Sequence, residues 1–184
     1  MIVHKFGGTS VGDAHRMAGV AEIVASRHGQ GRVSGEAVVV VSAMCGVTDQ
    51  LIAGARAAAE GRDSVYREIR AEVVGRHLQV IEALLERSAE RLQVAGWVED
   101  RLHEVGLFYR SIAMLGELTP RGHDAVATFG EELSARILAA VLQAQGVRAQ
   151  ALSATQLIVT DGHHGAAVPL MDETRARLRS GILP

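Results

Sequence analysis

The opening of the chain places one lysine and several glycines between a predicted strand, residues 2–6, and a predicted helix. Gly7, Gly8 and Gly12 follow Lys5 closely. Because glycine has no Cβ atom, the backbone can come close to an anion and direct its N–H groups at it, and the dipole of the next helix favours negative charge. Lys5 adds a mobile positive charge. This arrangement predicts a phosphate site.

The spacing of these residues matches neither of the common phosphate-binding motifs. Gly7 and Gly12 have the separation found in a P-loop, but Asp13 stands where that motif requires lysine. The Gly-x-Gly-x-x-Gly pattern of dinucleotide sites is not formed either. From spacing alone, a phosphate-binding turn and a purely structural turn whose glycines supply a positive φ are equally favoured.

The residues that follow predict a βαβ unit. Residues 14–26 carry apolar side chains at helical spacing, residues 27–35 form a polar glycine-rich turn, and residues 38–41 are four consecutive valines. A continuous valine run predicts a strand that is buried on both faces, as in a parallel sheet covered by helices. Two parallel strands joined through a helix are the simplest arrangement of these elements.

The middle of the chain predicts helices only. Residues 63–115 show two apolar stripes at helical spacing, which indicates an antiparallel helical pair inserted between strands of the sheet. The charged residues there, Arg76 among them, are interpreted as solvated faces. Further on we expect a helix from about 124 to 145, a short strand near 147–152, and a last helix over 172–180 that is capped by Asp172 and ended by Gly181.

Composition limits the partners that this chain can have. The 184 residues suffice for one sizeable core. A net charge of −2 and 3% aromatic residues favour neither nucleic acid nor a membrane surface, so a small molecule is the expected partner. Cys45 is the single cysteine, which excludes an internal disulfide and suits a reducing compartment. With no apolar stretch of the ~20 residues that a span needs, we predict a cytoplasmic protein.

Three segments resemble one protein family. Residues 5–11, Lys-Phe-Gly-Gly-Thr-Ser-Val, are similar to the opening signature of aspartokinases, the amino-acid kinases that phosphorylate the side-chain carboxylate of aspartate. Relatives that act on other substrates open with lysine and glycines but lack the Phe-Gly-Gly-Thr-Ser run. Residues 42–49 and 129–134 resemble the same family, in the expected order and at plausible separations.

This resemblance implies a fold, a domain and a reaction. The fold is an α/β, three-layer α/β/α sandwich around a mainly parallel sheet, with the helical insertion at about 63–115. Residues 1–184 would be the N-terminal portion of a single catalytic domain that continues beyond Pro184, and this portion alone is expected to be inactive. The reaction uses ATP and Mg²⁺ and converts L-aspartate to 4-phospho-L-aspartate, the entry to lysine, threonine and methionine biosynthesis. The full-length protein is expected to be a homo-oligomer.

The resemblance also assigns the nucleotide site. Lys5 would bridge the phosphates of ATP and stabilise the transferring group, which makes it the expected catalytic residue; the alternative is a solvated lysine at a strand end. Gly7 and Gly8 would donate backbone N–H groups to the phosphates, and Ser42 would lie on the phosphate side. Ser10 is equally explained by a hydroxyl group in the nucleotide site and by a helix cap.

Two further residues are assigned to aspartate. By resemblance Thr48 holds the substrate, although without the resemblance a helix N-cap is the better explanation for it. Asp49 stands where the family usually has asparagine and is expected to face the helix N-terminus. The resemblance gives Glu131 the substrate ammonium, and its helical neighbours are apolar or small. Glu132 is expected on a solvated face, paired with Arg136 four residues on.

The remaining candidates are weaker. Cys45 is interpreted as a small loop side chain rather than a nucleophile, because phosphoryl transfer needs none. His163 and His164 lack partners at ligand spacing, so no protein-bound metal is predicted, and Mg²⁺ would be held mainly by nucleotide phosphates and water. Two other functions stay open: a non-catalytic structural or assembly module of the same fold, and a kinase for another carboxylate.

Overall fold

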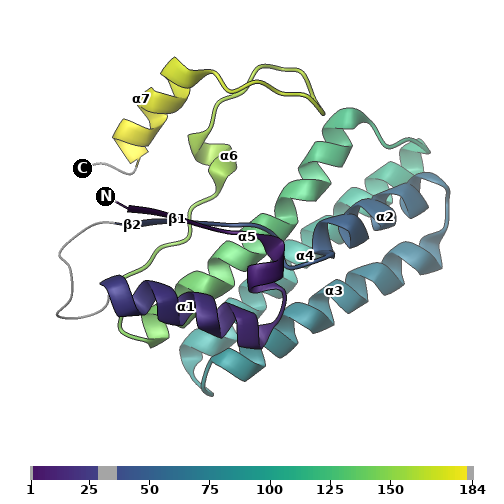
Figure 1. Ribbon diagram of the computed structural model, residues 1–184. Coiled ribbons are helices and arrows are strands. Elements are labelled where there is room, and N and C mark those ends of the chain that lie inside the picture. Colours follow the sequence, from purple (N-terminus) through teal and green to yellow (C-terminus); the bar gives the residue numbers. More distant parts are fainter. Residues whose placement is uncertain (1, 29–36, 182–184) are drawn as a thin grey trace.

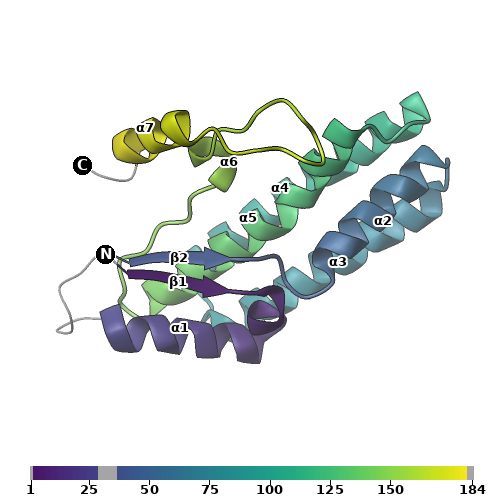
Figure 2. The ribbon, with the colours of Figure 1, turned by 45° about the horizontal axis from the view of Figure 1, so that its top comes forward.

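The computed structural model describes residues 2–28 and 37–181, and it begins with the predicted βαβ unit. Strand β1 (Ile2–Phe6) pairs in parallel with β2 (Ala37–Val41), with Lys5 opposite Val40. Helix α1 (Ala14–His28) connects them and lies alongside the sheet (Figure 2). A 3₁₀ helix, η1 (Gly8–Val11), separates β1 from α1. Most of the predicted turn at 27–35 lies outside the described residues.

The valine run of β2 is less buried than its sequence predicts. Residues two apart in a strand share a face, so the register places Val3, Lys5 and Val40 together. Val3 is 61% exposed and Val40 46% exposed, whereas Val39 and Val41 pack against the core. The prediction that β2 is buried on both faces is therefore wrong for the described residues. β-Branched residues favour strands in general, and their continuity does not reveal which faces a helix covers.

A group of long helices forms most of the molecule (Figure 1). These are α2 (Val47–Ala59), α3 (Asp63–Leu84), α4 (Ala89–Leu115) and α5 (Pro120–Ala144). The α3–α4 pair fills the predicted insertion at 63–115. Its ends follow from local chemistry: Ser88 accepts a hydrogen bond from the Arg91 amide, and Gly116 takes a positive φ of 67° after the last turn of α4.

Close packing between helices depends on small residues. A Cβ atom on Gly54 of α2 would lie 2.5 Å from the Tyr109 hydroxyl oxygen, so only glycine admits the Tyr109 ring of α4 here. The Tyr109 hydroxyl donates a hydrogen bond of 2.8 Å to the Leu51 carbonyl. Burial also raises the pKa of Tyr109, because the charged form is poorly solvated.

The C-terminal part contains short elements and one prediction that is wrong. Residues 147–152 form no strand: in the described residues the sheet contains only β1 and β2, and this segment does not pair with either. Instead α6 (Ala154–Leu157) is followed by an isolated antiparallel bridge between Thr160 and Pro169. The last helix, α7 (Met171–Gly181), is close to the prediction, although Asp172 lies inside it rather than capping it. No helix in the described ranges combines the length and apolarity needed to cross a membrane.

Candidate active site

The candidate site lies where the two parallel strands end. The Ser42 amide, directly after β2, donates a hydrogen bond of 3.2 Å to the Phe6 carbonyl at the end of β1. Lys5 and Ser42 therefore share one edge of the sheet. Figure 2 shows both strands running toward the side on which η1 and the first turn of α2 lie. Ligands of open parallel sheets bind outside this carboxyl edge.

The glycines after β1 allow close packing rather than unusual backbone angles. Gly7 has a φ of −78° and Gly12 a φ of −67°, so the interpretation that these glycines supply a positive φ is wrong. A Cβ atom on Gly8 would instead lie 2.9 Å from the Ala43 carbonyl oxygen, and one on Gly12 would lie 3.3 Å from Cys45 Cβ. Nothing lies within 4 Å of a Cβ built on Gly7, which leaves open space there.

The third family-like segment, residues 129–134, lies in α5 and contacts the loop after β2. A Cβ atom on Gly130 would lie 2.6 Å from Ala43 Cβ and 3.4 Å from Val47 Cγ1. Gly130 is buried, and this contact brings the helix that carries Glu131 against the loop after β2. The three motifs recognised in the sequence, which are far apart along the chain, thus meet around Ala43.

Several polar groups at this edge are available to a ligand. Lys5 is exposed, and Ser10, Ser42 and Thr48 are half-buried. Within residues 2–28 and 37–181, the side chains of these four residues form no hydrogen bond or ion pair. Thr48 is the second residue of α2, whose N-cap is Gly46 with a φ of 78°, so the alternative of Thr48 as the N-cap is wrong. These hydroxyl groups remain free for the roles that the resemblance gives them.

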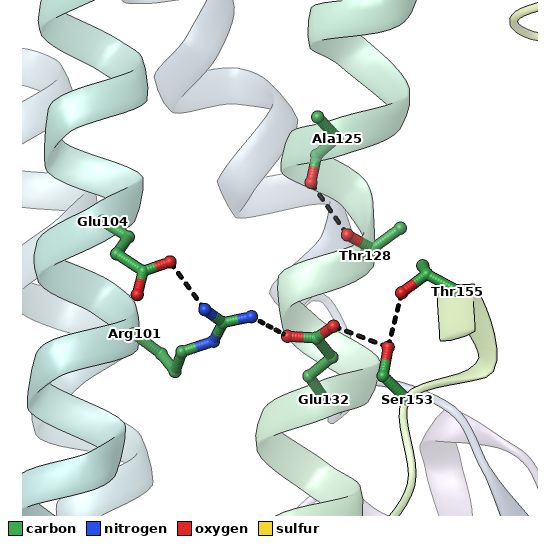
Figure 3. Close-up of polar contacts among 7 residues, drawn as sticks. All are labelled: Arg101, Glu104, Ala125, Thr128, Glu132, Ser153 and Thr155. Atoms are coloured by element: carbon green, nitrogen blue, oxygen red, sulfur yellow. Dashed lines mark hydrogen bonds and ion pairs between the residues drawn. The ribbon is translucent and has the colours of Figure 1, made fainter. Parts of the chain in front are cut away.

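Glu132 is placed differently from the prediction, whereas the role of Glu131 stays a prediction. Glu131 is exposed, and it has no ion pair in the described part of the chain. Glu132 has a side chain only 16% exposed, and it accepts a hydrogen bond of 2.6 Å from Arg101 of α4 (Figure 3). The predicted pair with Arg136 is not formed. Helical spacing considers one helix only, whereas α4 brings a stronger partner from outside it.

Glu132 belongs to a network that joins three parts of the fold (Figure 3). The Ser153 hydroxyl donates to its second carboxylate oxygen at 2.8 Å, and Arg101 also donates to Glu104 at 2.6 Å. The Arg101 guanidinium lies over the Phe129 ring, 5.4 Å from its centroid. The network connects α4, α5 and the segment before α6, which is a structural role.

Two arginines contact the glycine turn, and the sequence analysis missed both. Arg76 of α3 donates a hydrogen bond of 2.9 Å to the Gly12 carbonyl, although it was assigned to a solvated face. Arg16 donates to the Thr9 carbonyl at 2.8 Å. No local pattern marks the first contact, because Arg76 lies 64 residues from Gly12 in the chain.

The structure also places the remaining candidates, which are Cys45, the histidine pair and Asp49. Cys45 is an exposed free thiol in the loop beside Gly12. His163 lies 3.2 Å from Asp161, and His164 lies 3.3 Å from Asp124. No three side chains of the metal-binding types converge within the described ranges. Asp49 is exposed in the first turn of α2, where a negative charge complements the helix dipole.

Comparison with known proteins identifies the family. The model of the amino acid kinase family matches residues 1–182. Aspartokinase 1 of Arabidopsis thaliana, a chloroplastic protein, is 34% identical over 162 residues, which are 86% of this chain and 26% of that protein. The aspartokinase of Chlamydia pneumoniae is 28% identical over 175 residues, 95% of this chain and 34% of that protein. The chain therefore belongs to the amino acid kinase family.

A solved structure of an aspartokinase has the same fold as this chain. Aspartokinase III of Escherichia coli, in complex with aspartate and ADP, superposes with a TM-score of 0.83 at 26% identity, covering 100% of this chain and 38% of that one. This match confirms the predicted α/β class, here mostly helical with a small parallel sheet. The chain spans well under half of the length of each of these relatives, and it corresponds to their N-terminal part.

Proposed function

We propose that residues 1–184 form the N-terminal portion of the catalytic domain of an aspartokinase. The reaction transfers the γ-phosphoryl group of ATP to the side-chain carboxylate of L-aspartate and yields ADP and 4-phospho-L-aspartate. It is the first step toward lysine, threonine and methionine. The observation that carries this proposal is the meeting of three aspartokinase-like motifs at the carboxyl edge of β1 and β2, around Ala43.

The chemistry of the reaction explains why such an edge is needed. Two anions, a phosphate and a carboxylate, must come into contact, so catalysis consists mainly of alignment and charge neutralisation. Lys5 brings a positive charge that no acidic side chain of the described residues neutralises. Ser10 and Ser42 supply hydroxyl donors, and Gly7 and Gly8 supply backbone that a phosphate can approach. These groups would hold the nucleotide phosphates.

The substrate would lie between α2 and α5. Thr48 offers a hydroxyl group in the first turn of α2, and Glu131 offers a carboxylate on the neighbouring helix. A carboxylate without an ion-pair partner suits the α-ammonium group of aspartate, because a charged hydrogen bond is stronger than a neutral one. Glu131 would therefore orient the amino acid, with its side-chain carboxylate toward the phosphates.

The residues present fit ATP better than a metal ion bound by protein alone. Free hydroxyl groups, one lysine and the open space beside Gly7 suit phosphate oxygens. Mg²⁺ would arrive with the nucleotide, held mostly by phosphates and water, and would neutralise part of their charge. Lys5 would complete this neutralisation at the transferring group.

Three further parts of the proposal concern the whole protein. The 184-residue chain alone is expected to show little turnover, because the remaining substrate and nucleotide contacts would lie in a longer chain. That longer protein would be a homo-oligomer. A cytoplasmic location is proposed from the single free cysteine, Cys45, which suits a reducing compartment. A coupled ADP-release assay with aspartate, on the 184-residue chain and on a longer version, tests the first of these points.

The phosphate site can be tested on the chain itself. Lys5 is the only lysine in the sequence, so an amine-reactive acetylating reagent has one side-chain target and the α-amino group as internal reference. We expect Mg·ATP to slow acetylation of Lys5 but not that of the α-amino group, as followed by mass spectrometry. AMP, which lacks the β- and γ-phosphates, should protect little. Equal rates with and without Mg·ATP, both in this chain and in a longer version that shows turnover, would remove Lys5 from the nucleotide site.

A further inference from the structure

The glycine turn after β1 is held from outside by a helix of the insertion. Arg76 lies in α3, is half-buried, and donates a hydrogen bond of 2.9 Å from its guanidinium Nη2 to the Gly12 carbonyl. Gly12 is the C-cap of η1, so this carbonyl is one that the short helix cannot satisfy internally. The bond connects the end of the turn to a helix that is distant in sequence.

The turn has little stiffness of its own. A 3₁₀ helix has poorer hydrogen-bond geometry than an α-helix, and η1 has four residues. Glycine at Gly8 and Gly12 adds backbone freedom that must be lost on ordering. A partner that fixes a carbonyl also fixes the next amide, because the peptide unit is planar and trans. Arg76 therefore restricts the direction of the Asp13 N–H group and anchors the C-terminal end of η1.

We propose that Arg76 is a positioning residue for nucleotide binding, which holds the turn at residues 8–12 in the shape that receives the phosphates. This inference rests on the proposed function, since it assumes that the turn contacts a nucleotide. It makes α3, an element outside the three motifs, part of the nucleotide site. Arg16 donates to the Thr9 carbonyl at 2.8 Å, but its side chain is 53% exposed, so its contribution is smaller.

The chain offers a matched control on the same helix. Arg70 is also a half-buried arginine of α3, and its guanidinium donates a hydrogen bond of 3.5 Å to the Leu102 carbonyl of α4. Its Cδ atom lies 3.2 Å from a Cβ built on Gly106. Arg70→Gln therefore removes one positive charge and one arginine–carbonyl contact from α3, as Arg76→Gln does, but leaves the glycine turn untouched.

The test measures nucleotide affinity and turn dynamics on the 184-residue chain. Mg·ATP is titrated by calorimetry, and exchange of the Ser10 amide, which donates to the Gly7 carbonyl at 2.9 Å, is followed by NMR. We expect Arg76→Gln to raise the Kd for Mg·ATP about tenfold, as for the loss of one charge-assisted hydrogen bond, and to speed Ser10 exchange. Arg70→Gln should change the Kd less than about twofold. Arg76→Lys, which keeps a donor and the charge, should fall between wild type and Arg76→Gln.

Each outcome decides one of the two claims. An unchanged Kd in Arg76→Gln, or an equal rise in Arg70→Gln, overturns the positioning role. If the wild-type 184-residue chain binds no Mg·ATP, the titrations are repeated on a longer version of the chain. Absence of binding there too overturns the proposed nucleotide site, and Ser10 exchange in the 184-residue chain decides the hold on the turn by itself. Faster exchange in Arg76→Gln than in Arg70→Gln supports the hold on the turn, and equal exchange overturns it. If Arg76→Gln does not fold, the same comparison is made with Arg76→Lys.

Discussion

Among the described residues, polar side chains are paired in the helical body, which consists of α2 to α5, and unpaired at the carboxyl edge of the sheet. In the body, the Tyr109 hydroxyl donates to the Leu51 carbonyl, and Glu132 is paired with Arg101. At the sheet edge, the side chains of Lys5 and Thr48 have no partner in the described part of the chain. Pairing stabilises a fold, whereas an unpaired polar group is free for a ligand. We therefore expect substitutions of the paired residues to lower stability and substitutions of the unpaired residues to weaken binding.

The largest expected effect belongs to Lys5. On the proposed function, Lys5→Ala in a longer version of the chain should lower kcat by roughly 10²–10³, about 2.7–4 kcal/mol, because the charge would act most on the transferring phosphoryl group. The KM for aspartate should change little. Since Lys5 is exposed and makes no ion pair among the described residues, the melting temperature should stay within about 1 °C of wild type. Steady-state kinetics and thermal unfolding check both statements. A kcat close to wild type would contradict the catalytic role.

The two adjacent glutamates give the sharpest version of the comparison. Glu131→Gln should raise the KM for aspartate by the value of a charged hydrogen bond, about 1.5–3 kcal/mol, with little loss of stability. Glu132→Gln should do the opposite. It weakens the half-buried contact with Arg101 and should lower the free energy of unfolding by about 1–3 kcal/mol, while the KM changes little.

Both measurements must be made on both variants. The KM for aspartate comes from the longer enzyme, and the free energy of unfolding comes from urea denaturation of the 184-residue chain. A kinetic defect in Glu132→Gln larger than that in Glu131→Gln would reverse the assignment of the two carboxylates. If the two variants changed the KM and the free energy of unfolding equally, Glu131 and Glu132 would not differ in role, and the proposed division between a substrate-binding and a structural carboxylate would be wrong.

Helical periodicity and local motifs account for what the sequence predicts well. The spacing of apolar residues gives the helices of 63–115, since that pattern is set within each helix. The three segments that resemble aspartokinases give Lys5 and Glu131 as candidates. For the glycines at 8 and 12, the sequence left two explanations open, because close approach of the backbone and a positive φ both require glycine. The structure excludes the positive φ and shows close packing, while the approach of a phosphate stays a prediction.

The wrong predictions for Glu132 and Arg76 arise from contacts between segments that are distant in sequence. Glu132 was assigned to Arg136 because only its own helix was considered, whereas Arg101 lies 31 residues away and is brought in by the packing of α4 on α5. The contact of Arg76 with Gly12 has the same origin. In both pairs an arginine of one element binds an oxygen of another, and nothing in the local pattern of either residue predicts the partner.

A substitution at Gly130 tests the contact between α5 and the loop after β2. Gly130→Ala would place a Cβ atom 2.6 Å from Ala43 Cβ, so the helix or the loop must shift. We expect a loss of about 1–3 kcal/mol in the free energy of unfolding, as is typical of overpacking. The control is Gly96→Ala in α4, where nothing lies within 4 Å of the new Cβ and alanine should be neutral or stabilising. Urea unfolding of both variants decides, and an equal response would show that the contact can relax.

The smallest expected effect is a pH dependence inside the body. Burial lowers the pKa of His77, the neighbouring Arg76 lowers it further, and the contact with the Val73 carbonyl at 2.7 Å opposes them in part. The unfolded chain therefore takes up a proton at about pH 6.5, where the folded protein does not. The free energy of unfolding should be highest above that pH and fall below it, by at most about 1.4 kcal/mol per pH unit for one proton. Urea unfolding at pH 7.5 and 5.5 measures the difference. His77→Asn should be less stable at both pH values but show a smaller fall, whereas His103→Asn, at an exposed position in α4, should keep the wild-type fall. An identical fall in all three proteins would assign the pH dependence to other groups.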